Sequence, residues 1–163
     1  MKWTRPTNTT LLVSLGALVL TIGCVAMVIH SRADNSSKES PSFATVLPQG
    51  ASIESLGGWR KASPPGSDPA FAYTDTVDSV AVSVSQQKLP RDFSQNPAAH
   101  VAELAKSYNA TTQFIVDDTP IYIGTSAKGP QSVIFTKRGL LILIKSQQKI
   151  SDVAWKRYIT SLE

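Results

Sequence analysis

One uninterrupted apolar stretch near the N-terminus constrains this chain more than any other feature of its sequence. The run from Leu11 to Ile29 contains no charged residue and no proline. As an α-helix with a rise of about 1.5 Å per residue, it would span roughly 28 Å, close to the thickness of the hydrocarbon core of a bilayer. We therefore expect residues 11–29 to form a single transmembrane helix that tethers the rest of the chain to a membrane.

Two processing signals compete with this interpretation. Ser31 and Ala33 have the small-x-small spacing of a signal-peptide cleavage site, but the apolar run is longer than the roughly 7–15 residues of a signal-peptide core. Cys24 follows Gly23 as in a lipoprotein signal, yet the run continues for five residues beyond it. Cleavage of the anchor and lipidation at Cys24 stay open as alternatives, and an uncleaved anchor fits the length of the run best.

The charges that flank the apolar run set the expected orientation. Lys2, Arg5 and the N-terminal amine precede it, whereas the positive charges that follow it are partly offset by the acidic residues Asp34 and Glu39. The positive-inside rule then places residues 1–10 in the cytoplasm as a short tail. Residues 30–42 have mixed charge and no large apolar side chain, which is typical of a flexible linker. We expect residues 43–163 to fold as one extracytoplasmic domain at the cell membrane.

The composition of this domain argues against nucleic-acid binding. Beyond Ile29 the chain has 14 basic and 12 acidic residues, so its net charge is too small for a basic nucleic-acid footprint. The only cysteine, Cys24, lies in the apolar run, so no disulfide can form within the domain. A domain of roughly 120 residues can instead be held by burial and hydrogen bonding.

Residues 43–69 are punctuated by glycine and proline, which predicts a loop wrapped around the domain. Its expected anchoring contacts are Val46, Leu47, Ile53, Leu56 and Trp59. Apolar alternation on both sides of Asp78-Ser79 then predicts a β-hairpin that ends at Leu89-Pro90.

Two helices and four further strands complete the expected domain. Asn96 and Pro97 are typical of a helix start, and Asn109 of a helix end. The last helix is expected to begin at the cap Ser151 and to bury Trp155, Tyr158, Ile159 and Leu162. Between the helices, short apolar segments separated by turns predict strands at 112–116, 121–125, 131–136 and 140–145. The expected fold class is α+β, an antiparallel β-meander sheet with two packed helices, preceded by one N-terminal transmembrane helix.

The strand at 140–145 carries its own signal. Leu140 to Ile144 is apolar at every position, so both of its faces should be covered. We therefore expect this strand to lie inside the sheet.

The residues that carry chemistry are sparse. His100 is the only histidine of the domain, and it has no cysteine or second histidine to share a metal, so we expect an exposed helix histidine. Ser126 and Lys128 could form a serine–lysine dyad only in a desolvated pocket, and both are expected in a turn. Asp117-Asp118 is typical of a turn. We predict that the protein is not an enzyme, with no catalytic residue, no cofactor and no metal.

One short motif is a candidate for partner binding. Trp59 is followed directly by the cations Arg60 and Lys61, and these three residues could present a contact surface. Packing of Trp59 into the core is the competing interpretation.

The order of these segments resembles uncharacterised bacterial single-pass membrane proteins, whose ectodomain is similar to the small C-terminal domain of anti-sigma-factor-like membrane proteins. The residues that carry the resemblance are Gly57-Gly58-Trp59, Phe71 to Asp75, Val82 to Gln87, Leu89-Pro90, the helix up to Asn109, Ile121 to Gly124, and the final strand and helix. It implies a bacterial, extracytoplasmic, non-catalytic domain. It does not imply sigma regulation, because residues 1–10 are too few to hold a sigma factor.

Three functions therefore remain in order of preference. The first is a membrane-tethered extracytoplasmic binding or sensing module without catalytic activity, whose partner is an envelope protein or ligand. The second is an accessory subunit of a membrane complex that associates through its anchor helix. The third is an envelope hydrolase.

Overall fold

The computed structural model describes residues 39–163. The predicted tail 1–10, transmembrane helix 11–29 and most of the linker 30–42 lie outside the described residues, as does Cys24. Within residues 39–163, no helix is both long and apolar enough to cross a membrane.

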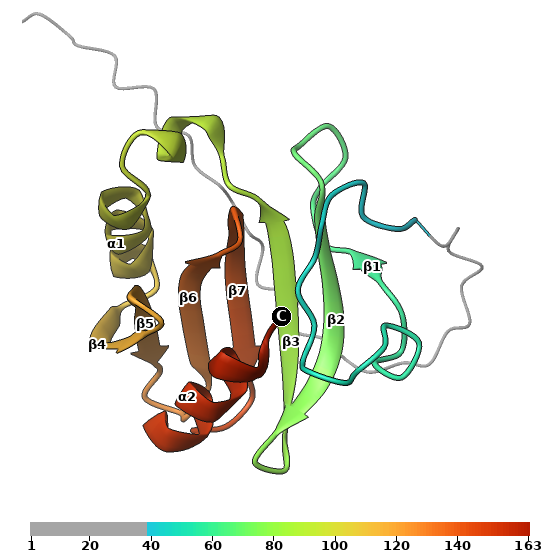
Figure 1. The fold of residues 1–163 in the computed structure, drawn as a ribbon. Coiled ribbons are helices and arrows are strands. Elements are labelled where there is room, and N and C mark those ends of the chain that lie inside the picture. Colours follow the sequence, from blue (N-terminus) through green and yellow to red (C-terminus); the bar gives the residue numbers. More distant parts are fainter. Residues whose placement is uncertain (1–38) are drawn as a thin grey trace, which may run out of the picture. The chain divides into compact units, whose positions relative to one another are not determined.

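A seven-stranded antiparallel sheet organises the described part of the chain, and two helices pack against it (Figure 1). Its elements are β1 (Arg60–Lys61), β2 (Ala70–Val77), β3 (Val80–Lys88), the short 3-10 helix η1 (Arg91–Ser94), α1 (Pro97–Ser107), β4 (Ala110–Val116), β5 (Thr119–Thr125), β6 (Gln131–Lys137), β7 (Leu140–Ser146) and α2 (Asp152–Ser161). The prediction of an α+β fold with an antiparallel sheet and two helices is confirmed.

The strand order refines the predicted meander. The order β1-β2-β3-β7-β6-β5-β4 contains two meanders, β1 to β3 and β4 to β7, which meet where β3 pairs with β7. After β3 the chain passes through α1 to the far edge of the sheet and returns strand by strand. The meander predicted for the four strands after α1 is confirmed. The pairing of β3 with β7 was not predicted, because the local alternation of side chains does not reveal which edge the chain reaches after a helix.

Two-residue turns close three of the hairpins, those of β2 with β3, β4 with β5 and β6 with β7. Their central residues all have positive φ, which matches the twist of the flanking strands. These pairs are Asp78-Ser79, Asp117-Asp118 and Arg138-Gly139. The turns expected at Asp78-Ser79 and at Asp117-Asp118 are confirmed.

Both helices begin where the sequence indicates, and α1 also ends there, whereas α2 ends at Ser161, so that the predicted helix residue Leu162 is buried just beyond it. The Asn96 side chain accepts a hydrogen bond from the Ala99 amide at 3.2 Å, and Asn109 beyond the end of α1 has a φ of 52°. The Ser151 hydroxyl accepts from the Ala154 amide at 3.2 Å and caps α2. Each cap satisfies an amide that the first helical turn leaves unpaired.

The larger core lies between one face of the sheet and α2. Leu140, Ile142 and Ile144 of β7 are buried there with Trp155, which has no exposed surface. On the opposite face, Leu141 packs with residues of α1 in a smaller cluster. The expectation that β7 is an interior strand covered on both faces is confirmed.

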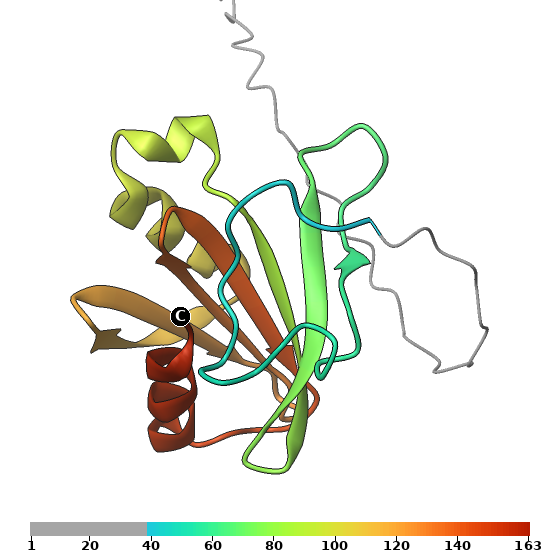
Figure 2. The same ribbon diagram turned by 45° about the vertical axis from the view of Figure 1, so that its right-hand side comes forward.

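Residues 43–59, the wrapping segment, cross the same face as α2 (Figures 1 and 2). The fully buried Gln86 holds this segment, because its amide donates to the Val46 carbonyl at 2.6 Å and accepts from the Val46 amide at 3.0 Å. Leu47 forms two main-chain hydrogen bonds with Glu163. The predicted anchoring residues all pack against the core, and only β1 interrupts the predicted loop.

Candidate functional site

The face of the sheet opposite α2 carries a row of polar positions. Lys145 lies between Ile144 and Ser146 and so points away from the core that α2 covers. It pairs in register with Ser83 on one side and Ser132 on the other. Because directly opposed residues share a face of an antiparallel sheet, these side chains form one line.

The row extends in both directions from Lys145. Thr74 stands opposite Ser83, and Gly124 stands opposite Ser132. Thr74 is exposed, and Ser83 and Ser132 are half-buried. Five neighbouring strands thus contribute hydroxyl groups, one ammonium group and a glycine to one continuous strip.

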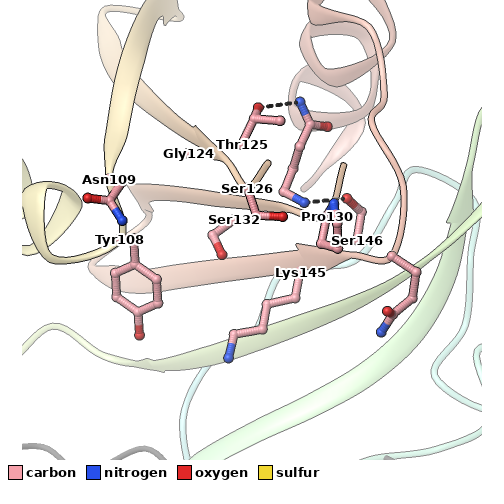
Figure 3. A pocket seen from close by; sticks show the side chains of 11 residues that line it. Tyr108, Asn109, Gly124, Thr125, Ser126, Pro130, Ser132, Lys145 and Ser146 are labelled. Carbon is pink, nitrogen blue, oxygen red and sulfur yellow. Dashed lines mark hydrogen bonds between the residues drawn. The ribbon is translucent and has the colours of Figure 1, made fainter. Parts of the chain in front are cut away.

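At the Gly124 end, the row enters a groove of about 330 Å³ (Figure 3). Its lining residues come from the end of α1 and from the ends of β5, β6 and β7, and they are Tyr108, Asn109, Gly124, Thr125, Ser126, Pro130, Gln131, Ser132, Lys145, Ser146 and Gln147. Figure 3 shows Tyr108 and Lys145 reaching out on the same side, with Ser132 between them. We refer to this hollow as the groove.

Gly124 allows α1 to form the wall of the groove. A Cβ atom at this position would collide with the main-chain carbonyl oxygen of Tyr108 and crowd Ala110. The end of α1 therefore rests directly on β5, which places Tyr108 beside the polar row.

The groove offers hydrogen-bonding groups and one positive charge. Burial raises the pKa of the Tyr108 phenol above its ordinary value, so the phenol stays protonated and can donate a hydrogen bond. Serine and threonine hydroxyls donate and accept, whereas the exposed Lys145 ammonium only donates. Such a lining suits a hydroxylated ligand that carries negative charge.

Gln131 ties the groove to the core beneath it. This side chain is only 3% exposed, and its carbonyl accepts from the Ile150 amide at 2.7 Å and from the Trp155 indole at 3.0 Å. Its amide group donates to the Thr125 hydroxyl at 3.2 Å. The position of Thr125 in the groove is therefore set by the same residue that holds α2.

A second hollow of about 400 Å³ lies near the opposite ends of β5 and β6. Two cations line it, Lys137 and the exposed Arg138, and the Lys137 ammonium donates to the Ile159 carbonyl at the end of α2 at 2.9 Å. Desolvation lowers the pKa of Lys137, although Asp117 opposes this effect. Because Asp117 lines the second hollow and no carboxylate lines the groove, an acidic ligand fits the groove better.

A buried phenol lies on the α2 face, away from the groove. Tyr73 has no exposed surface, and its hydroxyl makes no hydrogen bond of good geometry, although Tyr158 and Gln86 lie near it. Tyr158 donates to the Asp75 carboxylate at 2.9 Å. Desolvation, with Asp75 acting in the same direction, raises the pKa of Tyr73 from 10.0 to about 12.

This pKa shift predicts a loss of stability in alkali. The folded state holds the Tyr73 proton more tightly than the unfolded state, so its contribution is complete below pH 10 and is lost as the pH rises toward 12. At about 1.4 kcal/mol per pKa unit, the loss is roughly 2–3 kcal/mol. Near neutral pH, Tyr73→Phe should unfold in urea at nearly the wild-type midpoint. Above pH 10, this variant should lose less stability than the wild type does. Tyr122→Phe, which removes a phenol from the other face, is the control, and equal alkaline losses in both variants would contradict this account.

The predicted partner-binding residues lie at the other end of the sheet, in and beside β1. Trp59 is half-buried, and its ring packs edge-on against Tyr73 at 5.4 Å and Phe71 at 6.5 Å between centroids. Arg60 and Lys61 are exposed, and Lys61 forms an ion pair with Glu39 at 3.0 Å. Trp59 thus contributes to packing, and the end of the predicted linker contacts the domain.

The remaining candidate residues from the sequence, His100, Ser126 and Lys128, do not form a common site. His100 is half-buried rather than exposed, because its ring stacks on Phe93 with 4.9 Å between centroids. Ser126 and Lys128 are exposed in the turn between β5 and β6, as expected. In the part of the chain that the structure describes, no group of three or more histidine, cysteine, aspartate or glutamate residues is placed to hold a metal ion.

The comparisons with known proteins add no relative. No protein-family model matches the sequence, and searches of curated proteins and of solved structures find no significant match. The resemblance to anti-sigma-factor-like ectodomains therefore stays a prediction.

Proposed function

We propose that this protein is a membrane-tethered, extracytoplasmic binding module that acts without catalysis and contacts its ligand at the groove. The single observation that carries the proposal is the polar row from Thr74 to Gly124, which continues into the groove beside Tyr108. An antiparallel sheet commonly has one solvated face, but here a helix end walls that face and one ammonium group lies in the hollow.

The lining favours an acidic saccharide of the cell envelope as ligand. Hydroxyl and amide groups match the many hydroxyls of a sugar, and the Tyr108 ring offers an apolar surface beside them. Lys145 supplies the single charge that a carboxylate or phosphate on the saccharide would meet. With residues 11–29 as anchor, the domain would hold such a polymer close to the membrane.

The proposal is tested by binding of the full chain in detergent to a polyuronic acid, with neutral dextran as the uncharged probe. We expect binding to the polyuronic acid that weakens about threefold to tenfold in Lys145→Gln, because a partly solvated ion pair contributes about 1 kcal/mol. Lys128→Gln removes the same charge from the neighbouring turn, outside the groove lining, and should bind like the wild type.

Equal weakening in both lysine variants would contradict a role for the groove. A chain in which an unrelated transmembrane helix replaces residues 11–29 should keep its binding. Loss of binding in that chain would favour the accessory subunit that associates through its anchor.

A further inference from the structure

The charged side chains of the strands are divided unevenly between the two faces of the sheet. Asp75 is the only acidic residue in the seven strands that the structure describes, and its carboxylate accepts from Tyr158 at 2.9 Å on the α2 face. The opposite face, which we call the groove face, carries the polar row from Thr74 to Gly124 with the Lys145 ammonium in its middle. The strands thus present positive charge and no carboxylate on the groove face.

Arg60 is a second cation of the groove face. It pairs in register with Ala72, which stands opposite Ser85, and Ser85 in turn stands opposite Leu143. Lys145 follows Leu143 by two residues on β7. Because side chains alternate along a strand and opposed residues share a face, Arg60 and Lys145 lie on the same side of the sheet.

Both cations are open to a ligand. Arg60 and Lys145 are exposed, and within residues 39–163 neither of them forms an ion pair. Lys61, the neighbour of Arg60, points to the other face and is paired with Glu39 at 3.0 Å. Arg60 and Lys145 are therefore the charges of the strands that an anion on the groove face would meet.

A surface of small side chains joins the two cations. Helix α1 packs against β4, β5 and β6, so it covers the β4 side of the groove face. On β2 and β3, the groove-face positions between the groove and β1 hold alanine, serine and threonine, and these residues are Ala72, Thr74, Ser83 and Ser85. No long side chain stands there, and the hydroxyls can donate and accept. A flat chain of sugar rings can therefore lie along this surface.

We propose that the ligand is an extended acidic saccharide chain that lies across the strands from the groove to β1, and that Arg60 is its second cationic contact. This inference rests on the function proposed for the groove and extends it. Five strand spacings, roughly 24 Å, separate β5 from β1. One ring of a linear saccharide is about as long as one strand spacing, so the strip takes about five rings.

The separation of the two cations selects for chain length. Three strand spacings, roughly 14 Å, separate Lys145 on β7 from Arg60 on β1. An acid of two rings is too short to span them, whereas a longer chain meets both charges at once. The second contact then forms within one complex, which raises affinity beyond that of either contact alone.

The strip is tested by titration calorimetry of the full chain in detergent with the dimer and the octamer of galacturonic acid. We expect the wild type to bind the octamer at least about tenfold more tightly than the dimer. Arg60→Gln should weaken octamer binding about threefold to fivefold, as expected for one exposed ion pair, and leave dimer binding unchanged. Lys61→Gln removes the neighbouring cation from the opposite face and should bind both probes like the wild type.

A second pair of variants tests the surface between the cations. Thr74→Glu places a carboxylate in the proposed path, so it should weaken octamer binding, whereas the neutral Thr74→Gln of similar size should weaken it less. Both should bind the dimer like the wild type, because Thr74 lies outside the groove lining. Unchanged circular dichroism melts of these variants and of Arg60→Gln exclude a loss of folding as the cause.

The outcomes separate this inference from the function on which it rests. If neither galacturonide bound, the proposed function and the extended strip would both fail. The strip alone would be overturned, with the groove keeping its function, if the dimer bound as tightly as the octamer. The same would follow if Arg60→Gln bound the octamer like Lys61→Gln, or if the two Thr74 variants bound it equally.

Discussion

Replacing Trp155 with alanine is expected to remove roughly 3–5 kcal/mol from the free energy of unfolding of residues 39–163. The indole has no exposed surface, packs edge-on against Tyr158 with 6.4 Å between centroids, and donates to Gln131 at 3.0 Å. Its removal leaves a cavity between α2 and the sheet, where the surrounding side chains can collapse only in part. Urea unfolding followed by circular dichroism measures the loss.

Two further variants separate burial from helix propensity. Trp155→Phe keeps most of the apolar volume and loses the indole hydrogen bond, so it should lose only about 1–2 kcal/mol. Val153→Ala changes an exposed position of the same helix and should alter stability by less than about 0.5 kcal/mol. A Trp155→Ala variant as stable as Val153→Ala would show that α2 does not bury this face.

Replacing Gln131 with leucine is expected to cost roughly 2–5 kcal/mol, because it leaves two buried donors without an acceptor. These donors are the Ile150 amide and the Trp155 indole, from which the Gln131 carbonyl oxygen accepts hydrogen bonds at 2.7 and 3.0 Å. Leucine has a similar volume, so the loss reports on hydrogen bonding more than on packing. The measurement is again the urea midpoint and slope of residues 39–163.

Gln87→Leu is the matched control for this prediction. Gln87 is half-buried on β3 and faces away from the α2 core, since its neighbour Gln86 points into that core. Its replacement should change stability by less than about 1 kcal/mol. If Gln131→Leu and Gln87→Leu unfolded at the same urea concentration, solvent would have to reach the two donors.

Local sequence signals predicted most of the secondary structure. The pair Asp78-Ser79 marked a turn, Asn96 and Ser151 marked helix starts, and the apolar run after Gly139 marked an interior strand. Each of these features depends on the geometry of a few adjacent residues, which is why a single sequence reveals them.

Features that depend on distant residues were not predictable in the same way. The pairing of β3 with β7 joins segments separated by α1 and three strands, and alternation along either strand does not specify its neighbour. Gln86 and Gln131 read as solvated polar residues, yet both are buried because each satisfies main-chain groups of a remote segment.

The groove was missed for a related reason. Its members come from α1, β5, β6 and β7, and only the register of the sheet brings Lys145 next to Ser132. The available signal was the alternation of Ser83 and Ser85 with the valines of β3, which marks a solvated face. The predicted contact residues were chosen because an aromatic residue adjoined two cations, but Trp59 packs against Tyr73.

The most direct test of the central claim is photo-cross-linking from the groove in native membranes. A photoreactive residue in place of Ser132 in the full chain should form an adduct with an envelope component, whereas the same residue in place of Lys128 should not. Lys145→Gln should lower the yield of this adduct. The captured component should have the mass of its unmodified form, because the protein binds it without catalysing a reaction. The account would be contradicted if the yield of adduct from position 132 did not exceed that from position 128. It would also be contradicted if the wild-type chain cleaved or altered the captured component.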